Sequence, residues 1–135
     1  MTPAAEDDRA TIEHVLELNR RLLAAIADGD WNSYAELCDP TLTAFEPEAR
    51  GQLVEGMEFH HFYFGLGGIA RPHNTTMSSP HVRLLGDVAV VSYVRLVQRL
   101  DEAGKPSTVR SEETRVWRRQ GGAWRHVHFH RSMNG

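Results

Sequence analysis

The hydrophobic pattern of this chain changes its period once, near Thr75. Before this point apolar residues recur at helical spacing, most clearly in residues 12–26. After it, apolar and polar residues alternate with a period of two, as in residues 88–100. Helices followed by a run of strands favour an α+β fold, in which the N-terminal helices pack on one side of a curved antiparallel sheet.

Three helices are expected before the change of period. The first ends at Gly29, since glycine is common just beyond a helix C-terminus. Asp30 is placed to cap a short second helix, which Pro40 would end. A third, aromatic-rich helix is expected in residues 54–64.

Three or four strands fit the remainder of the chain, joined by short connections of the hairpin type. They cover roughly residues 75–85, 88–100, 107–119 and 123–132. The length of 135 residues is that of one domain, so we expect a single domain over residues 1–135, with an ordered core of about residues 8–132.

One face of the predicted strands carries arginines among apolar neighbours. Because successive strand residues point to opposite faces, each face can be considered separately. This face contains Ala89, Val91, Tyr93, Arg95, Val97, Val109, Ser111, Glu113, Arg115, Trp117, Val127, Phe129 and Arg131. A buried guanidinium keeps its charge and needs an anion. Glu113 can balance one arginine, and the others indicate a ligand with a carboxylate, phosphate or sulfate group. The alternative is an internal salt-bridge network with a second acid and no ligand.

The opposite face of the strands is also apolar, with Val88, Val90, Val94, Leu96, Val116 and Trp124. Two or three short helices can cover only one face of such a sheet. We therefore expect a second copy of the chain to cover the other face, which predicts a homo-oligomer. The alternative is a monomer with an apolar outer face.

Charge and composition exclude several classes of partner. Fifteen basic residues against eighteen acidic ones give a net charge of −3, so nucleic-acid binding is not expected. No apolar run is long enough to span a membrane, and the first residues lack a basic and an apolar region typical of export. Cys38 is the single cysteine, so we expect no internal disulfide and a cytoplasmic location.

Four stretches of the chain resemble the association (hub) domain of calcium/calmodulin-dependent protein kinase II, a member of the nuclear transport factor 2-like (SnoaL-like) superfamily. They begin with Cys38-Asp39-Pro40, Leu53-Val54-Glu55-Gly56-Met57, Ser111-Glu112-Glu113-Thr114-Arg115-Val116-Trp117 and Val127-His128-Phe129-His130-Arg131-Ser132. The first continues to Phe45-Glu46-Pro47-Glu48-Ala49 and the second to Phe59-His60 and Phe62-Tyr63-Phe64. The resemblance covers nearly the whole chain, up to Ser132.

The resemblance implies a self-associating, cystatin-like cone whose sheet wraps a deep pocket. By position in the motifs, the arginines and the histidine of that pocket correspond to Arg95, Arg115, Arg131 and His60. Together with Tyr93, which shares the arginine face, they form the predicted ligand-binding set. The chain departs from the family between residues 64 and 75, which are fewer and contain glycines in place of a tryptophan.

These features predict a stand-alone, hub-like oligomerisation domain, a dimer or a larger ring of dimers, with a pocket for a small carboxylate or other anion. No kinase motif, such as a Gly-rich loop, is present in the sequence, and no basic amphipathic helix of the kind that calmodulin binds. We expect no cofactor and no metal.

Two other functions remain open. Cone-fold relatives include isomerases, dehydratases and cyclases, in which the cavity holds an acid–base pair. The candidate catalytic groups here are His60, Tyr93 and Glu113, although pairing with Arg115 would make Glu113 a poor base. The third function is a scaffold with an inert pocket.

The repeat His126-x-His128-x-His130 resembles a metal-binding pattern. A period of two would place all three histidines on the strand face opposite to the arginines. Three residues of one strand cannot converge on one ion, so we expect a surface or interface role for them rather than a metal site.

Overall fold

Residues 3–133 are described by a computed structural model, and their elements follow the predicted order of helices before strands. The helical elements are α1 (Pro3–Asp28), α2 (Trp31–Leu37), the 3-10 helix η1 (Pro47–Ala49) and α3 (Glu58–Phe64). The strands are β1 (Cys38–Phe45), β2 (Val54–Glu55), β3 (His73–Leu85), β4 (Val88–Leu100), β5 (Pro106–Gln120) and β6 (Ala123–Ser132). The α+β class is therefore confirmed, and the third helix begins at Glu58, later than predicted.

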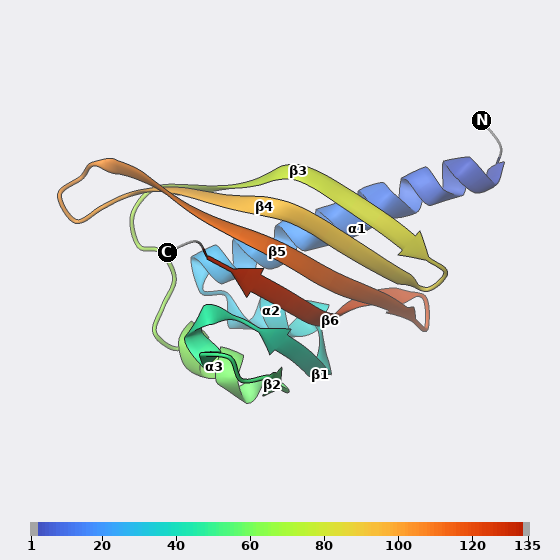
Figure 1. The fold of residues 1–135 in the computed structure, drawn as a ribbon, viewed down its shortest axis with the longest axis horizontal. Coiled ribbons are helices and arrows are strands. Elements are labelled where there is room, and N and C mark those ends of the chain that lie inside the picture. The colour runs from blue at the N-terminus through green and yellow to red at the C-terminus, as the bar shows by residue number, and fades with distance from the viewer. Residues whose placement is uncertain (1–2, 134–135) are drawn as a thin grey trace.

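The strands form one sheet in the order β2-β1-β6-β5-β4-β3 (Figure 1). The four long strands are antiparallel neighbours, as predicted, but β1 runs parallel to β6. The sheet is thus mixed, which corrects the expectation of an antiparallel sheet. The pairing joins segments more than eighty residues apart, so the local period of the β1 sequence contains no signal for it.

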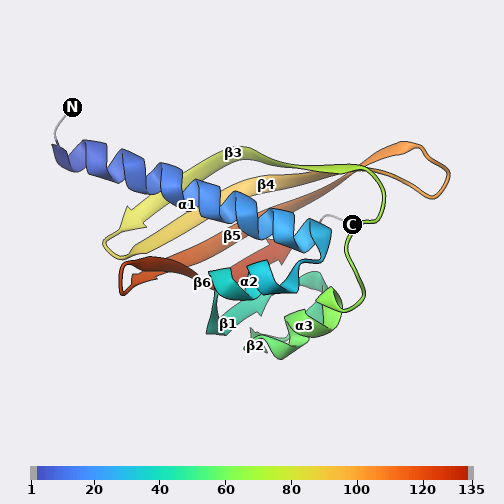
Figure 2. The ribbon, with the colours of Figure 1, turned by 180° about the vertical axis from the view of Figure 1, so that it is seen from behind.

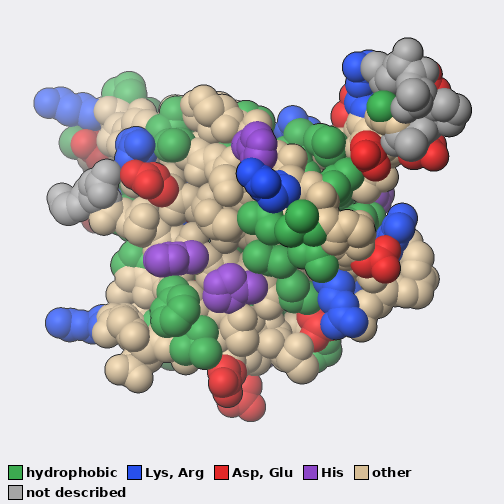
Figure 3. Space-filling model, turned by 45° about the vertical axis from the view of Figure 1, so that its right-hand side comes forward, with side chains coloured by type: hydrophobic (Ala, Val, Ile, Leu, Met, Phe, Trp, Pro, Cys, Tyr) green, Lys and Arg blue, Asp and Glu red, His purple; other side chains and the backbone are tan. Residues whose placement is uncertain are grey.

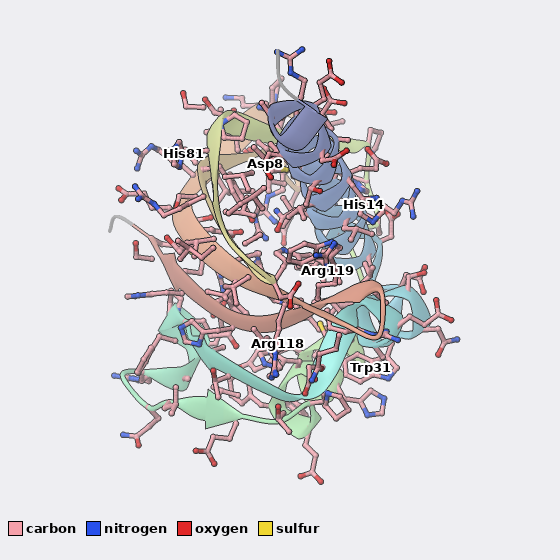
Figure 4. The ribbon with its side chains drawn as sticks, turned by 90° about the vertical axis from the view of Figure 1, so that its right-hand side faces the viewer. Asp8, His14, Trp31, His81, Arg118 and Arg119 are labelled. Carbon is pink, nitrogen blue, oxygen red and sulfur yellow. The ribbon has the colours of Figure 1, made fainter. Side chains whose placement is uncertain are left out.

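The helices cover one face of this sheet. Figure 2 shows α1 lying across β3, β4 and β5, with α2 and α3 beside β6 and β1. Seen along the strands, the sheet curves around the helical side, and His81 lies on the convex side, away from α1 (Figure 4). No helix among residues 3–133 is long and apolar enough to cross a membrane.

The helix α1 binds the sheet through one apolar stripe and one polar contact. Val15, Leu18 and Leu22 recur at spacings of three and four residues and are buried against the sheet. Within this stripe Asn19 is also fully buried, and its Oδ1 accepts a hydrogen bond of 3.0 Å from Nε1 of Trp117. The sequence therefore specifies which face of α1 packs inward.

The end of α1 lies against the glycine-containing segment after α3. Gly29 ends the helix, as predicted, with a φ of +69°, which favours glycine. Ile69 donates a backbone hydrogen bond of 2.8 Å to Ala27, which brings Gly68 close to the helix end. A Cβ on Gly68 would lie 2.3 Å from the carbonyl carbon of Asp28. The glycine here therefore permits the backbones to approach each other.

A β-bulge in β6 changes which residues of this strand face the helices. The register with β5 shifts between Val116, opposite His128, and Trp117, opposite His126. His126 is fully buried as a result, and Trp124 is also buried in the core. The prediction that the three histidines share one face is wrong for His126, and Trp124 does not belong to the outer face. An extra residue in one strand exchanges the faces of all residues beyond it.

The convex face of the sheet is apolar at its centre. Val88, Val90 and Val94 lie on it and are only partly buried. Figure 3 shows hydrophobic side chains gathered over this side of the molecule, next to histidines. Within residues 3–133 no helix packs on this face (Figures 1 and 2), so its half-buried apolar side chains remain accessible.

Candidate functional site

A cavity of about 250 Å³ lies between the helices and the concave face of the sheet. Four of the five predicted ligand-binding residues line it: His60 from α3, Arg95 from β4, Arg115 from β5 and Arg131 from β6. The other lining residues are Ile26, Tyr34, Glu46, Glu48, Tyr63, Phe64 and Phe129. The cavity thus combines aromatic walls with guanidinium and carboxyl groups.

Tyr93, the fifth predicted residue, lies behind the cavity wall in a buried network around Glu113. Its hydroxyl donates a hydrogen bond of 2.6 Å to Oε1 of Glu113 and accepts one of 2.9 Å from Nε of Arg115. The carboxylate of Glu113 also binds Nη2 of Arg115 at 3.0 Å and Nη1 of Arg95 at 3.2 Å. Glu113 therefore pairs with two arginines at once, one through each of its oxygens.

This network decides the protonation of its members. Although burial raises the pKa of Glu113, the guanidinium groups of Arg115 and Arg95 outweigh it and hold that pKa below its ordinary value. Burial raises the pKa of Tyr93 to about 12. Glu113 is thus ionised and Tyr93 neutral near pH 7, which makes the pair unsuited to proton abstraction, as the sequence analysis expected for Glu113.

Two acids at the cavity were missed by the sequence analysis. Glu46 and Glu48 flank Pro47 at the start of η1, in a segment that looks like an ordinary turn. Glu48 forms an ion pair with Nη2 of Arg131. The sequence near a turn does not determine which way a side chain points. Only the pairing of β1 with β6 brings these two acids close to the arginines.

Glu46 and His60 face each other inside the cavity. Oε1 of Glu46 lies 3.7 Å from Nδ1 of His60, and only about a tenth of the Glu46 side chain is exposed. Burial, with the charge of Glu48, raises the pKa of Glu46 to about 7. Burial, with the charge of Arg115, lowers the pKa of His60 to about 4, so this histidine is neutral near pH 7.

Two nitrogen atoms of the lining residues are buried without a hydrogen-bond partner in the part of the chain that the structure describes. They are Nε2 of His60 and Nε of Arg95. Buried polar atoms are nearly always paired in folded proteins, and an unpaired one indicates a missing ligand or water. Two residues that line the cavity therefore retain hydrogen-bonding capacity that the described side chains do not satisfy.

His126 contacts Arg115, one of the residues that line the cavity, which strand periodicity did not reveal. Its Nδ1 lies 3.4 Å from Sγ of Cys38 and its Nε2 lies 3.4 Å from Nη1 of Arg115. Burial and the neighbouring Arg115 lower its pKa well below the ordinary value, so the ring stays neutral. Burial raises the pKa of the Cys38 thiol to about 12, so this free cysteine is not an activated nucleophile.

His128 and His130 lie opposite Val116 and Thr114 of β5, on the outer face of the sheet. Nδ1 of His128 is 2.7 Å from the hydroxyl of Thr43. Among residues 3–133 no group of three or more His, Cys, Asp or Glu side chains is placed to hold one metal ion.

A family model and a curated relative both match this chain to the same family. Residues 11–135 match the sequence model described as "Calcium/calmodulin dependent protein kinase II association domain". The delta subunit of calcium/calmodulin-dependent protein kinase type II from Oryctolagus cuniculus is 50% identical over 130 residues. That alignment covers 94% of this chain but only 24% of the rabbit protein, so the chain spans about a quarter of its relative's length.

Solved structures agree with this. The hub homology domain from Chlamydomonas reinhardtii is 50% identical with a TM-score of 0.87, covering 93% of this chain and 99% of that one. The association domain from C. elegans is 43% identical with a TM-score of 0.90, covering 95% and 99%. A nuclear transport factor 2-like protein from Salmonella enterica, at 20% identity and a TM-score of 0.73, covers 91% and 90% and shares the fold.

Proposed function

Because this chain belongs to the calcium/calmodulin-dependent protein kinase II association domain family, we propose that it is a self-associating domain whose cavity binds a small carboxylate. The proposal has two parts, an assembly through the outer face of the sheet and an anion site inside the cone. Each part has its own support and its own experiment. A cytoplasmic location is part of the same proposal and suits the free thiol of Cys38.

Self-association is supported by the family and by the convex face of the sheet. The matching family and solved structures are described as association domains and hubs. The outer face carries half-buried valines such as Val90 and Val94, which a second copy of the chain would remove from water. A sheet covered by helices on one face only leaves this area available.

Light scattering of the purified chain at micromolar concentration tests the assembly. We expect a mass that is a multiple of 15.2 kDa. Val94→Glu should reduce that mass, since it places a charge on the outer face, whereas Asn32→Glu, on an exposed position of α2, should not. A monomeric mass for the unmodified chain contradicts the proposal.

Carboxylate binding is supported by His60 and Arg95, two cavity-lining residues that each have a buried nitrogen without a hydrogen-bond partner among the described residues. A carboxylate accepts up to four hydrogen bonds and is the usual partner of a guanidinium group. The aromatic lining, which includes Tyr34 and Phe64, suits an apolar body attached to the carboxylate. These features together favour a small organic acid over an inorganic ion.

Calorimetric titration with benzoate tests the site, with benzamide as the neutral ligand of the same shape. We expect benzoate to bind and benzamide to bind at least tenfold more weakly. Arg95→Met should abolish benzoate binding and still fold, because Glu113 keeps its ion pair with Arg115. The matched control is Arg99→Met, at an exposed position of the same strand. Equal binding of benzoate by Arg95→Met and by the unmodified chain contradicts the proposal.

A further inference from the structure

The net charge around the cavity depends on whether one carboxyl group, that of Glu46, is ionised. Three guanidinium groups line it, those of Arg95, Arg115 and Arg131. Glu113 is shared by Arg95 and Arg115, and Glu48 pairs with Arg131. With these two carboxylates the set has one positive charge left, and the carboxyl group of Glu46 is the remaining acid at the cavity. An ionised Glu46 therefore makes the cavity neutral, and a protonated Glu46 leaves it one positive charge.

Of the acids at the cavity and in the network behind it, Glu46 is the one without an ion pair to an arginine among the described residues. Among residues 3–133 the one basic side chain within 4.0 Å of its carboxyl oxygens is His60, whose Nδ1 lies at 3.7 Å. His60 is neutral near pH 7 because burial and the charge of Arg115 lower its pKa to about 4. The contact is thus that of a carboxyl group with a neutral imidazole, which does not favour the ionised carboxylate as an arginine would.

Groups from three other elements, η1, β5 and β6, also act on Glu46. Burial and the carboxylate of Glu48 oppose its ionisation, as does the more distant Glu113. Arg131 and Arg115 favour it, but their charges are already taken up by Glu48 and Glu113. The outcome is a pKa of about 7, so both forms of Glu46 are populated at neutral pH.

Tyr34 and Tyr93 do not titrate in the same range. Burial raises the pKa of Tyr34 well above its ordinary value and that of Tyr93 to about 12. Arginine side chains stay protonated throughout. The charge of Glu46 thus changes around pH 7, whereas His60, Tyr34 and Tyr93 are neutral there.

We propose that binding of a carboxylate in this cavity is coupled to uptake of one proton by Glu46. This inference rests on the proposed carboxylate binding. A ligand carboxylate brings a negative charge next to Glu46. This charge neutralises the remaining positive charge of the arginines, which the ionised Glu46 neutralises when no ligand is bound. Burying both negative charges together would be costly, so the protonated form of Glu46 is the form that binds. Glu46 then selects against dianions and makes affinity depend on pH.

The coupling has a quantitative consequence. If the anion binds only when Glu46 is protonated, the dissociation constant rises about tenfold per pH unit above about pH 7 and is nearly constant below pH 6. The sign follows from the proton, because raising the pH removes the form that binds. Benzoate itself stays ionised over this range, so its own titration does not contribute.

Calorimetric titration of the full chain with benzoate between pH 6 and pH 9 is the test. In two buffers of different ionisation enthalpy at pH 8, the difference in heat gives the number of protons taken up, which we expect to be close to one. Glu46→Gln, which is neutral at every pH, should bind benzoate at pH 9 as tightly as the unmodified chain does at pH 6. Its affinity should not change with pH, and its proton uptake should be zero.

Glu48→Gln is the matched variant, since it removes the neighbouring carboxylate and leaves Glu46 in place. It should keep a pH-dependent affinity and a proton uptake, with the transition shifted to lower pH because Glu48 no longer raises the pKa of Glu46.

The outcomes separate this inference from the proposed function. Benzoate binding that is independent of pH, without proton uptake, overturns the inference and leaves carboxylate binding intact. Loss of binding in Glu46→Gln at all pH values overturns it as well, because the ionised carboxylate would then be needed. Absence of binding by the unmodified chain at any pH overturns the proposed function and this inference together.

Discussion

Glu113 and Arg115, two residues apart on β5, form an ion pair of 3.0 Å in which neither side chain has more than 1% of its surface exposed. Residues two apart on a strand share a face, so this pair is built into the strand itself. Arg95 of the neighbouring strand binds the second oxygen of the same carboxylate. The chain itself thus supplies one of the anions that the arginines require. Arg115 and Arg95, but not Glu113, also line the cavity.

The first prediction concerns Glu113. Glu113→Gln leaves Arg115 and Arg95 buried without their carboxylate, so we expect the free energy of unfolding to fall by about 3–5 kcal/mol, as for other broken buried ion pairs. Urea unfolding at pH 7 measures it. Glu112→Gln, the neighbouring position on the outer face, is the control, since its pair with Arg110 is exposed and should contribute less than about 1 kcal/mol. Equal effects of the two variants would mean that the buried pair does not stabilise the fold.

The second prediction concerns the pH dependence of stability. The pKa of His60 is about 4 in the folded protein, below its ordinary value, so between pH 5 and pH 6 the unfolded chain binds a proton that the folded protein does not. Stability therefore falls as the pH is lowered through this window, by about 1 kcal/mol per pH unit from this residue. His60→Asn should reduce the slope of unfolding free energy against pH by that amount. Asn32→Ala, at an exposed position of α2, removes no ionisable group and should leave the slope unchanged.

The third prediction concerns Glu46, whose contribution to stability changes with pH in the opposite direction to that of His60. Its pKa of about 7 in the folded protein is above the ordinary value, so between about pH 5 and pH 7 the folded protein binds the additional proton. The stability that Glu46 contributes is complete below its unfolded pKa and is lost as the pH rises through 7. Glu46→Gln should therefore make stability increase more steeply with pH over this window. A shallower slope in urea unfolding would show that the carboxyl group is ionised in the folded protein.

The fourth prediction concerns the close approach of Gly68 to the end of α1. Gly68→Ala would place a Cβ 2.3 Å from the carbonyl carbon of Asp28, so the backbones must separate. We expect a loss of about 1–3 kcal/mol in thermal or urea unfolding, the usual range for such overpacking. Gly65→Ala is the control, since the nearest atom to its Cβ, the carbonyl oxygen of Phe62, is 3.3 Å away. A loss in Gly65→Ala as large as that in Gly68→Ala would remove the steric explanation.

The fifth prediction concerns the polar contact between α1 and β5. Asn19→Ala leaves Nε1 of Trp117 buried without its acceptor, so the free energy of unfolding should fall by about 1–3 kcal/mol. Arg20→Ala, next to it on the exposed side of the helix, should change stability by less than about 0.5 kcal/mol. Tryptophan fluorescence reports both the unfolding transition and the surroundings of the ring. No loss in Asn19→Ala would mean that another group satisfies the indole nitrogen.

Much of the site was predictable because strand facing is a local property. Alternation alone places Arg95 and Arg115 on one face with Tyr93, and the structure has them there, in contact through Glu113. Family motifs added His60, which lies in a helix where strand alternation does not apply. The residues predicted by alternation are those whose orientation follows from their neighbours in the sequence.

The sequence by itself determined the order of helices and strands and the inward facing of the arginines, since both follow from the period of apolar residues over a few positions. Only the tertiary structure decided that β1 runs parallel to β6, that a bulge turns His126 inward, and that Glu46 lies beside His60. Each of these depends on contacts between segments far apart in the chain, whose free energies no local pattern contains. The fold thereby places a carboxyl group of changeable charge next to arginines of permanent charge.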